Sequence, residues 1–167
     1  MFQNIKDDYN SHNREILNWG FVAMIIYRFG RWRYTIKSGV MRKPFSILYK
    51  LLFFYIKGKG IEIPCEIEIG KNFRIDHQGG IVVSGYAKFG SNCVIRNGVT
   101  IGIARVEERK APVFGDNVDI GTGAKIIGDI KIGNSVKIGA NAVVLKDIPD
   151  NCIAVGIPAK IIKQEVK

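Results

Sequence analysis

Histidine and cysteine are scarce in this 167-residue sequence. It contains two histidines, His12 and His77, and three cysteines without a C-x-x-C pair. Two histidines are too few for a three-histidine zinc site. An odd number of dispersed cysteines favours neither a disulfide framework nor a zinc knuckle. We therefore expect no metal, and we expect Cys65, Cys93 and Cys152 to be reduced structural thiols in a cytoplasmic protein.

Long hydrophobic runs are also lacking. Residues 16–27 carry no charge but are too few to cross a bilayer as a helix, and Lys50 interrupts the apolar segment at 45–56. The first residues, 1–15, are polar and of mixed charge, unlike a secretory signal peptide. The two apolar segments predict two surface helices, with Gly39 and Pro44 marking the break between them and the glycines at 58 and 60 ending the second.

Acidic residues are few in the first third of the chain. Residues 1–60 hold eleven Lys/Arg and three Asp/Glu, a net of 11 − 3 = +8, whereas residues 61–167 hold fourteen and twelve, a net of 14 − 12 = +2. This asymmetry argues against a uniformly basic nucleic-acid binder. We interpret residues 14–57 as a helical docking element that packs on the main domain or in an oligomer. Peripheral contact with the inner face of a membrane is the second reading.

Glycine has the opposite distribution. Only three of nineteen glycines precede residue 58. From about residue 61 large apolar residues recur every six positions, in three registers separated by short interruptions. Their members are Ile63, Ile69, Ile75 and Ile81, then Phe89, Ile95 and Ile101, then Phe114, Ile120, Ile126, Ile132, Ile138 and Val144. Turn-forming residues recur in the same rhythm, namely Asn92, Gly98, Asn117, Gly123, Asp129, Ser135 and Asn141.

A period of six fits neither an amphipathic helix nor a simple alternating strand. It fits a prism with three short parallel strands in each coil, one inward apolar residue per strand and one tight turn per corner. Thirteen hexads make a little over four coils. The sequence therefore predicts a helical region at 1–60 and a mainly β domain, a parallel β-helix, at 61–163. The charged segment 103–113 breaks the period and predicts a loop extruded from a coil.

The repeat, the extruded loop and the ending at 154–162 together resemble the hexapeptide-repeat acyltransferases, and within them the serine acetyltransferase branch. The resemblance covers residues 61–163 and rests on IDHQGGIVVSG at 75–85, NGVTIG at 97–102, the repeats at 120–149 and AVGIPAKII at 154–162. It implies a left-handed β-helix, acetyl-CoA as co-substrate, and a homotrimer or a dimer of trimers with active sites between neighbouring β-helices.

The resemblance also implies roles for single residues. His77 matches the catalytic histidine, which would be the general base for an acceptor hydroxyl; such a hydroxyl is a poor nucleophile until its proton is removed. Glu62 stands where the family has an aspartate that orients this histidine, and Asp76 where the family contacts the acceptor. Each of these two also has a plain structural reading. His12, in the polar N-terminal tail, is expected to be unimportant.

Three further positions match those that bind the pantetheine arm of acetyl-CoA, mainly through backbone groups. They are Gly102, Thr122 and Ala140. Small side chains at these positions would allow a close approach. The repeat by itself also demands small residues at its corners, so the two readings stand side by side.

The sequence departs from the serine acetyltransferases in three places. Lys110-Ala111 replaces the Arg-His pair before the loop proline, and Lys110, the expected acceptor-binding residue, offers charge without a bidentate fork. The helical region is short, and the terminal isoleucine that docks cysteine synthase is missing. These features are closest to the short acetyltransferases of capsular and exopolysaccharide clusters.

The sequence thus leaves three functions open. The first, and the one that the sequence favours, is O-acetylation of a sugar hydroxyl in surface polysaccharide synthesis, on an acceptor that is a small molecule or lipid-linked. The second is serine O-acetylation for cysteine synthesis, and the third is an inactive trimeric scaffold. The carbonic anhydrase-like β-helices are excluded because their metal requires three histidines.

Overall fold

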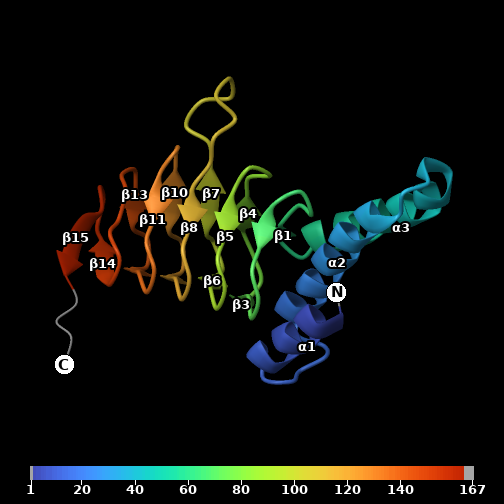
Figure 1. Cartoon of the computed structure of the whole chain (residues 1–167). Helices are drawn as coiled ribbons and strands as arrows, with labels where there is room; N and C mark the ends of the chain where they lie inside the picture. Colours follow the sequence, from blue (N-terminus) through green and yellow to red (C-terminus); the bar gives the residue numbers. More distant parts are fainter. Residues whose placement is uncertain (1, 164–167) are drawn as a thin grey trace.

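The computed structural model describes residues 2–163. It consists of a helical N-terminal region followed by a solenoid of short strands, and the third helix extends away from the solenoid (Figure 1). In the described residues no helix is long and apolar enough to span a membrane.

The helical region contains α1 (Phe2–Ser11), α2 (Trp19–Trp32), the 3₁₀ turn η1 (Arg33–Thr35) and α3 (Gly39–Lys57). The side chains of Asn18 and Ser38 accept backbone N–H groups at the starts of α2 and α3. The sequence reading missed α1. The break between the two predicted helices ends at Gly39, where α3 starts, and the prediction was wrong to extend it to Pro44, because α3 continues through that residue. Pro44 is the sixth residue of α3, beyond the first turn in which proline fits without cost, so the helix lacks one backbone hydrogen bond in its second turn.

The solenoid is built from three parallel sheets. The first contains β1 (Ile61–Glu62), β4 (Ile81–Val83), β7 (Thr100–Gly102), β10 (Lys125–Ile127) and β13 (Val143–Val144). The second contains β2 (Glu68–Ile69), β5 (Lys88–Phe89), β8 (Val113–Phe114) and β11 (Lys131–Ile132). The third contains β3 (Arg74–Asp76), β6 (Val94–Arg96), β9 (Asp119–Ile120), β12 (Lys137–Ile138), β14 (Cys152–Val155) and β15 (Lys160–Lys163). Among the strands of residues 2–163, only the last pair, β14 and β15, is antiparallel.

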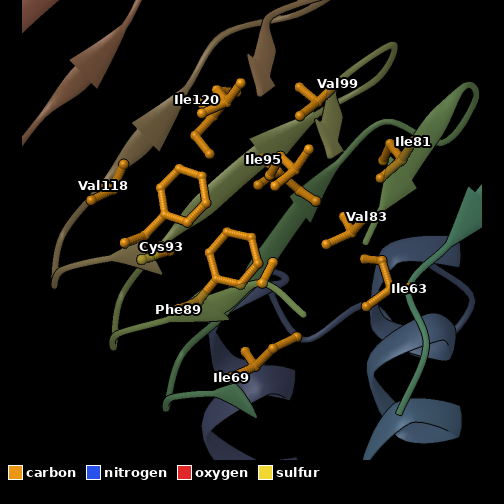
Figure 2. Packing of buried hydrophobic residues seen from close by; sticks show 14 of the residues in the cluster. Ile63, Ile69, Ile81, Val83, Phe89, Cys93, Ile95, Val99, Val118 and Ile120 are labelled. Carbon is orange, nitrogen blue, oxygen red and sulfur yellow. The ribbon is translucent and has the colours of Figure 1, made fainter. Parts of the chain in front are cut away.

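The core is the column of large apolar residues that the six-residue period predicted. In the second sheet Ile69 pairs with Phe89, Phe89 with Phe114, and Phe114 with Ile132. The rings of Phe89 and Phe114 stack with centroids 4.6 Å apart. Side chains of this column from successive coils fill the prism (Figure 2), and all of them are buried. The predicted fold is confirmed.

The corners show why the period needs turn formers. Asn92, Asn117 and Asn141 have φ between 56° and 60°, the left-handed region that asparagine tolerates better than most residues. Amide side chains also bond along one corner, from Asn72 to Asn92 and from Asn92 to Asn117. The prediction failed at Asp129, where the preceding Gly128 has the positive φ instead.

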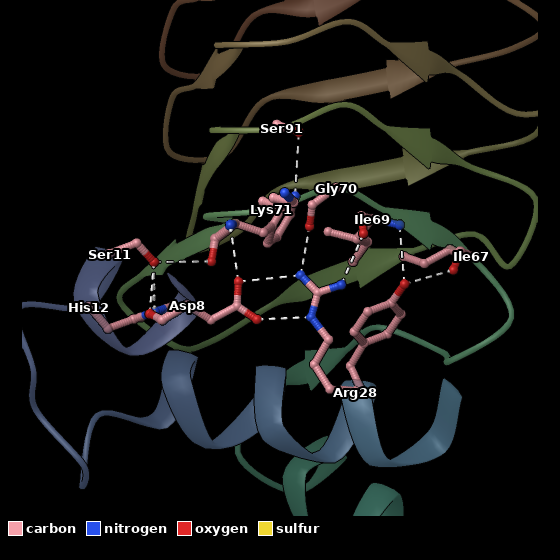
Figure 3. Close-up of polar contacts among 11 residues, drawn as sticks. Asp8, Ser11, His12, Arg28, Ile67, Ile69, Gly70, Lys71 and Ser91 are labelled. Atoms are coloured by element: carbon pink, nitrogen blue, oxygen red, sulfur yellow. Dashed lines mark hydrogen bonds and ion pairs between the residues drawn. The ribbon is translucent and has the colours of Figure 1, made fainter. Parts of the chain in front are cut away.

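The helical region closes the first coil of the solenoid. A strand at the end of a sheet has unpaired backbone groups, and at β3 and the residue before it these are bonded by side chains of α1 and of His12, which follows α1. The Phe73 N–H donates to Asp8 Oδ1 at 3.3 Å, and the Ile75 N–H donates to His12 Nε2 at 3.1 Å. Figure 3 shows α1 against this edge.

The edge of the second sheet is closed in the same way by α2. Arg28 donates to the carbonyls of Ile69 and Gly70, and the Tyr27 hydroxyl bonds the Ile67 carbonyl and the Ile69 N–H. Asp8 pairs with Arg28 at 2.9 Å, and both side chains are buried. Side chains of the helical region therefore form the hydrogen bonds that a preceding coil would otherwise supply.

His12 is buried in this contact rather than lying in a polar tail. Its Nδ1 is 2.7 Å from the Asp8 carbonyl, which fixes the proton on Nδ1 and leaves Nε2 to accept from Ile75. Burial lowers the pKa of His12, despite the opposing influence of Asp8 and Asp76. Ser11 Oγ, Arg74 and the Phe21 ring are its other neighbours.

We expect acid to weaken the fold through His12. Below about pH 6.5 the unfolded chain binds a proton at this residue that the folded chain excludes, so the free energy of unfolding falls as pH falls. One such group contributes a slope of at most about 1.4 kcal/mol per pH unit between its folded and unfolded pKa values. Urea unfolding across pH 5–7 should show a shallower slope for His12→Gln than for the native chain. His77→Asn is the control, because His77 is exposed. Equal slopes for the native chain and His12→Gln would contradict this assignment.

Candidate active site

Three of the residues expected at the site lie on one corner of the prism. His77 lies between β3 and β4, Thr122 between β9 and β10, and Ala140 between β12 and β13. Backbone bonds stack these turns along the prism: Gly98 N–H to the Gly79 carbonyl at 2.7 Å, Gly123 to Asn97 at 2.9 Å, and Asn141 to Thr122 at 2.8 Å. We call this row of turns between the third and first sheets, 77–80, 97–98, 121–123 and 140–141, the corner column.

His77 occupies the corner column in an exposed position. Its φ is 62°, in the left-handed region, so the turn places its imidazole outside the prism. Within residues 2–163 its ring nitrogens form no hydrogen bond in the single chain. A ring on a rigid corner with both nitrogens unengaged is suited to meet a ligand or a neighbouring subunit.

Asp76, next to His77, is held by arginines that the sequence reading did not single out. Arg74 Nε lies 3.0 Å from Asp76 Oδ1, and Arg96 Nη2 lies 3.8 Å from Oδ2. Arg96 also pairs with Asp119 one coil further on, and this contact raises the pKa of Arg96. The register β3–β6–β9 creates the ladder, since Asp76 pairs with Arg96. Recognising the coil register of Asp76 and Arg96 would have revealed it.

Glu62 lies on β1, the first strand of the first coil. Its carboxylate binds Lys57 Nζ at 3.0 Å, at the end of α3. The backbone just before it stacks under the corner column, since the Ile81 N–H donates to the Gly60 carbonyl at 2.9 Å. Within the described chain Glu62 and His77 form no hydrogen bond with each other. The structure thus brings Glu62 to the same end of the corner but gives its carboxylate a different partner.

Gly102 and Lys110 lie away from the corner column. Gly102 ends β7 at the corner between the first and second sheets, where its carbonyl accepts the Gly128 N–H at 3.0 Å. The loop leaves at this point and projects from the prism (Figure 1). Lys110 Nζ is bound by Asp129 at 2.8 Å, which raises the pKa of the lysine. β8 begins at Val113, so the loop covers 103–112, one residue fewer than expected.

The outer face of the first sheet lies between these two corners. Thr100 and Lys125 are register partners there, and Lys125 Nζ bonds the Thr100 hydroxyl at 3.0 Å and the Gly98 carbonyl. This face joins the corner column to Gly102, and small residues line both of its borders.

The small residues of these corners also serve the stacking of coils. A Cβ on Gly121 would lie 2.6 Å from the Ala140 nitrogen, and Gly123 has a φ of 74°, in the left-handed region that residues with a side chain rarely adopt. At Gly102 the nearest atom would be Ile127 Cδ1, at 3.3 Å. Glycine at 121 and 123 is therefore required by the fold alone, whereas at 102 the crowding is milder.

Known proteins match this chain over both of its regions. The family model described as Bacterial transferase hexapeptide (six repeats) matches residues 111–146. The serine acetyltransferase of Synechococcus elongatus is 38% identical over 144 residues, which are 86% of this chain and 57% of that protein. The chain thus spans little more than half the length of this curated relative.

Solved structures extend the match to the helices. Soybean serine acetyltransferase has a TM-score of 0.82 at 32% identity, covering 96% of this chain and 68% of that chain. A serine acetyltransferase solved in complex with CoA has a TM-score of 0.80 at 28% identity, over 96% of this chain and 68% of that chain. The likeness therefore includes α1–α3 as well as the repeats. The chain belongs to the hexapeptide-repeat acyltransferases, in their serine acetyltransferase branch.

Proposed function

We propose that this protein is an acetyl-CoA-dependent O-acetyltransferase whose acceptor is the hydroxyl of L-serine. The observation that carries the proposal is the match to serine acetyltransferases along nearly the whole chain, helices included, with His77 exposed on the corner column. A relative solved with CoA supports acetyl-CoA as the donor. We had favoured a sugar acceptor from sequence, and the comparisons favour serine.

The proposed chemistry uses His77 as general base. The imidazole takes the proton of the acceptor hydroxyl as its oxygen attacks the thioester carbonyl, and the carbon–sulfur bond then breaks to release CoA and the O-acetyl product. Glu62, within reach of the same corner, is proposed to orient His77 when Lys57 releases it. Gly102, Thr122 and Ala140 are proposed to border the pantetheine arm through their backbone groups.

A sugar hydroxyl is the second candidate acceptor, and the loop is the observation that favours it. Ala111 stands where the branch has a second histidine, and it is buried. Lys110, which would attract a carboxylate, already forms an ion pair with Asp129. A paired lysine binds an amino-acid carboxylate less well than an unpaired arginine would, and a carbohydrate acceptor has no carboxylate that requires a cation.

We further propose that the protein assembles as a homotrimer, or as a dimer of trimers. An imidazole without an intrachain partner and a site divided between two corners both suit a site completed by a neighbouring subunit. Light scattering on the purified protein tests this. A mass of three or six chains is expected, and a monomer with full activity would overturn the proposal.

The acceptor is tested by the release of free CoA thiol from acetyl-CoA. L-Serine is expected to stimulate release well above the rate without acceptor, and a panel of monosaccharides and nucleotide sugars is expected not to. Lys110→Ala should raise the KM for L-serine, because the loop cation expected at the acceptor is lost, with a smaller effect on kcat. Stimulation by a sugar and not by serine would show that the acceptor is a sugar hydroxyl, the second candidate. No stimulation by either would favour an inactive scaffold.

A further inference from the structure

Helix α3 has two apolar faces, and only one of them is covered. The covered face packs on α2 and the start of the solenoid and includes Tyr49 and Ile56. The opposite face consists of large apolar side chains that are exposed in the chain. They are Val40, Ile47, Leu48, Leu51, Phe54 and Tyr55, and the exposure of Phe54 reaches 79%. Spaced three, four and seven residues apart, they form one continuous stripe.

Lysines line this stripe along one edge. Lys43, Lys50 and Lys57 recur every seven residues, which is two helical turns, so they lie in one row beside the apolar residues. Lys57 is the member of the row that pairs with an acidic residue, Glu62. The charge around the helix has a single sign, because residues 16–61 contain nine Lys/Arg and no Asp or Glu.

We propose that this face of α3 binds the surface of an anionic lipid bilayer. A helix with an apolar stripe and a flanking row of lysines lies in the interface, with its apolar side chains among the acyl chains and its lysines at the head groups. The nineteen residues of α3 would lie along the surface for about 28 Å. Figure 1 shows the helix projecting from the solenoid, which leaves this face accessible in the chain. The inference does not depend on the proposed function.

Charge decides between a membrane and a second copy of the chain. Two copies packed through this face would bring two rows of lysines and two wholly basic segments together, with no acidic residue in 16–61 to compensate. An anionic surface instead attracts every one of these cations, by about 1 kcal/mol for each one near the surface. A helix that lies on the surface also agrees with the finding that no described helix spans a bilayer.

Vesicle sedimentation with the full chain tests the proposal. The protein is expected to sediment with phosphatidylcholine vesicles containing 30% phosphatidylserine and to remain in solution with pure phosphatidylcholine. Leu51→Glu/Phe54→Glu should abolish sedimentation, and Lys43→Glu/Lys50→Glu should lower the partition coefficient at least tenfold. Raising the salt to 0.5 M should weaken binding of the native chain.

The control is Val106→Glu, which replaces an apolar side chain that is 74% exposed in the loop, away from α3, by one glutamate. It should bind vesicles as the native chain does. Circular dichroism and thiol release show that each variant is folded. Binding to neutral vesicles as strongly as to anionic ones, or unaltered binding by either α3 variant, would overturn the proposal. So would failure of the native chain to bind. A smaller mass for Leu51→Glu/Phe54→Glu in light scattering, without vesicle binding by the native chain, would assign the face to a second copy instead.

Discussion

Replacing His77 by asparagine is expected to lower kcat/KM for the acceptor by about 10²–10⁴-fold, the usual range for removal of a general base. Asparagine is the right substitute because the position has a φ of 62°, and asparagine already occupies similar conformations at Asn72, Asn92 and Asn117. The backbone of the corner is thereby kept, and only the titrating ring is lost. Steady-state thiol release gives the result, with acetyl-CoA saturating and the acceptor varied.

Two controls separate chemistry from structure in this experiment. Lys71→Ala removes an exposed side chain from a different corner of the prism and should leave kcat/KM unchanged. The thermal midpoint of His77→Asn should equal that of the native chain, because the ring forms no intrachain hydrogen bond. A variant that keeps more than half of the native kcat/KM would show that His77 is not the base.

Replacing Asp8 by asparagine is expected to lower the free energy of unfolding by about 3–5 kcal/mol, because it leaves the Arg28 guanidinium buried without a counter-charge. Both side chains are almost inaccessible, and Arg28 also bonds the carbonyls of Ile69 and Gly70. Burial raises the pKa of Asp8 while Arg28 opposes that rise, so the carboxylate depends on its partner. Urea unfolding at one fixed protein concentration measures the loss.

An exposed ion pair of the same solenoid supplies the matched control. Glu68 and Lys88 lie 3.3 Å apart on the second sheet with more than half of each side chain in solvent. Glu68→Gln should therefore cost less than about 1 kcal/mol. The double variant Asp8→Leu/Arg28→Met should lose less free energy of unfolding than the sum of the losses of its two single variants, since neither charge then remains buried alone. A loss below about 1 kcal/mol for Asp8→Asn would show that water reaches the pair.

The repeat could be predicted because every hexad needs the same two features, an apolar residue that points inward and a residue that forms a turn. Ile120, Ile126 and Ile132 each fill the interior, and a turn former follows each one, so every coil repeats the signal. The helical region could not be predicted in the same detail. α1 is polar, and its stability comes from contacts with residues some sixty positions later, such as Asp8 with Phe73. A polar segment of this kind resembles a tail until its partners are known.

The candidate site shows the same division. The motif around His77 placed the imidazole on a corner, and the six-residue period brought Thr122 and Ala140 onto that corner. Charged partners were not predictable from the motif, because Lys57 reaches Glu62 from a helix and Asp129 reaches Lys110 across a loop. The partner of a long flexible side chain depends on which groups lie near it in the folded chain, and the six-residue period does not indicate those groups.

The closure of the first coil by Asp8, His12, Tyr27 and Arg28 also sets a limit on length. A parallel solenoid has no intrinsic stop, since each coil offers the next one a complete template of backbone donors and acceptors. Here that template is already occupied by side chains that cannot be extended into a further coil, and at the far end β15 turns antiparallel on β14. The solenoid is thereby protected at its helical end from growing by end-to-end addition into a filament.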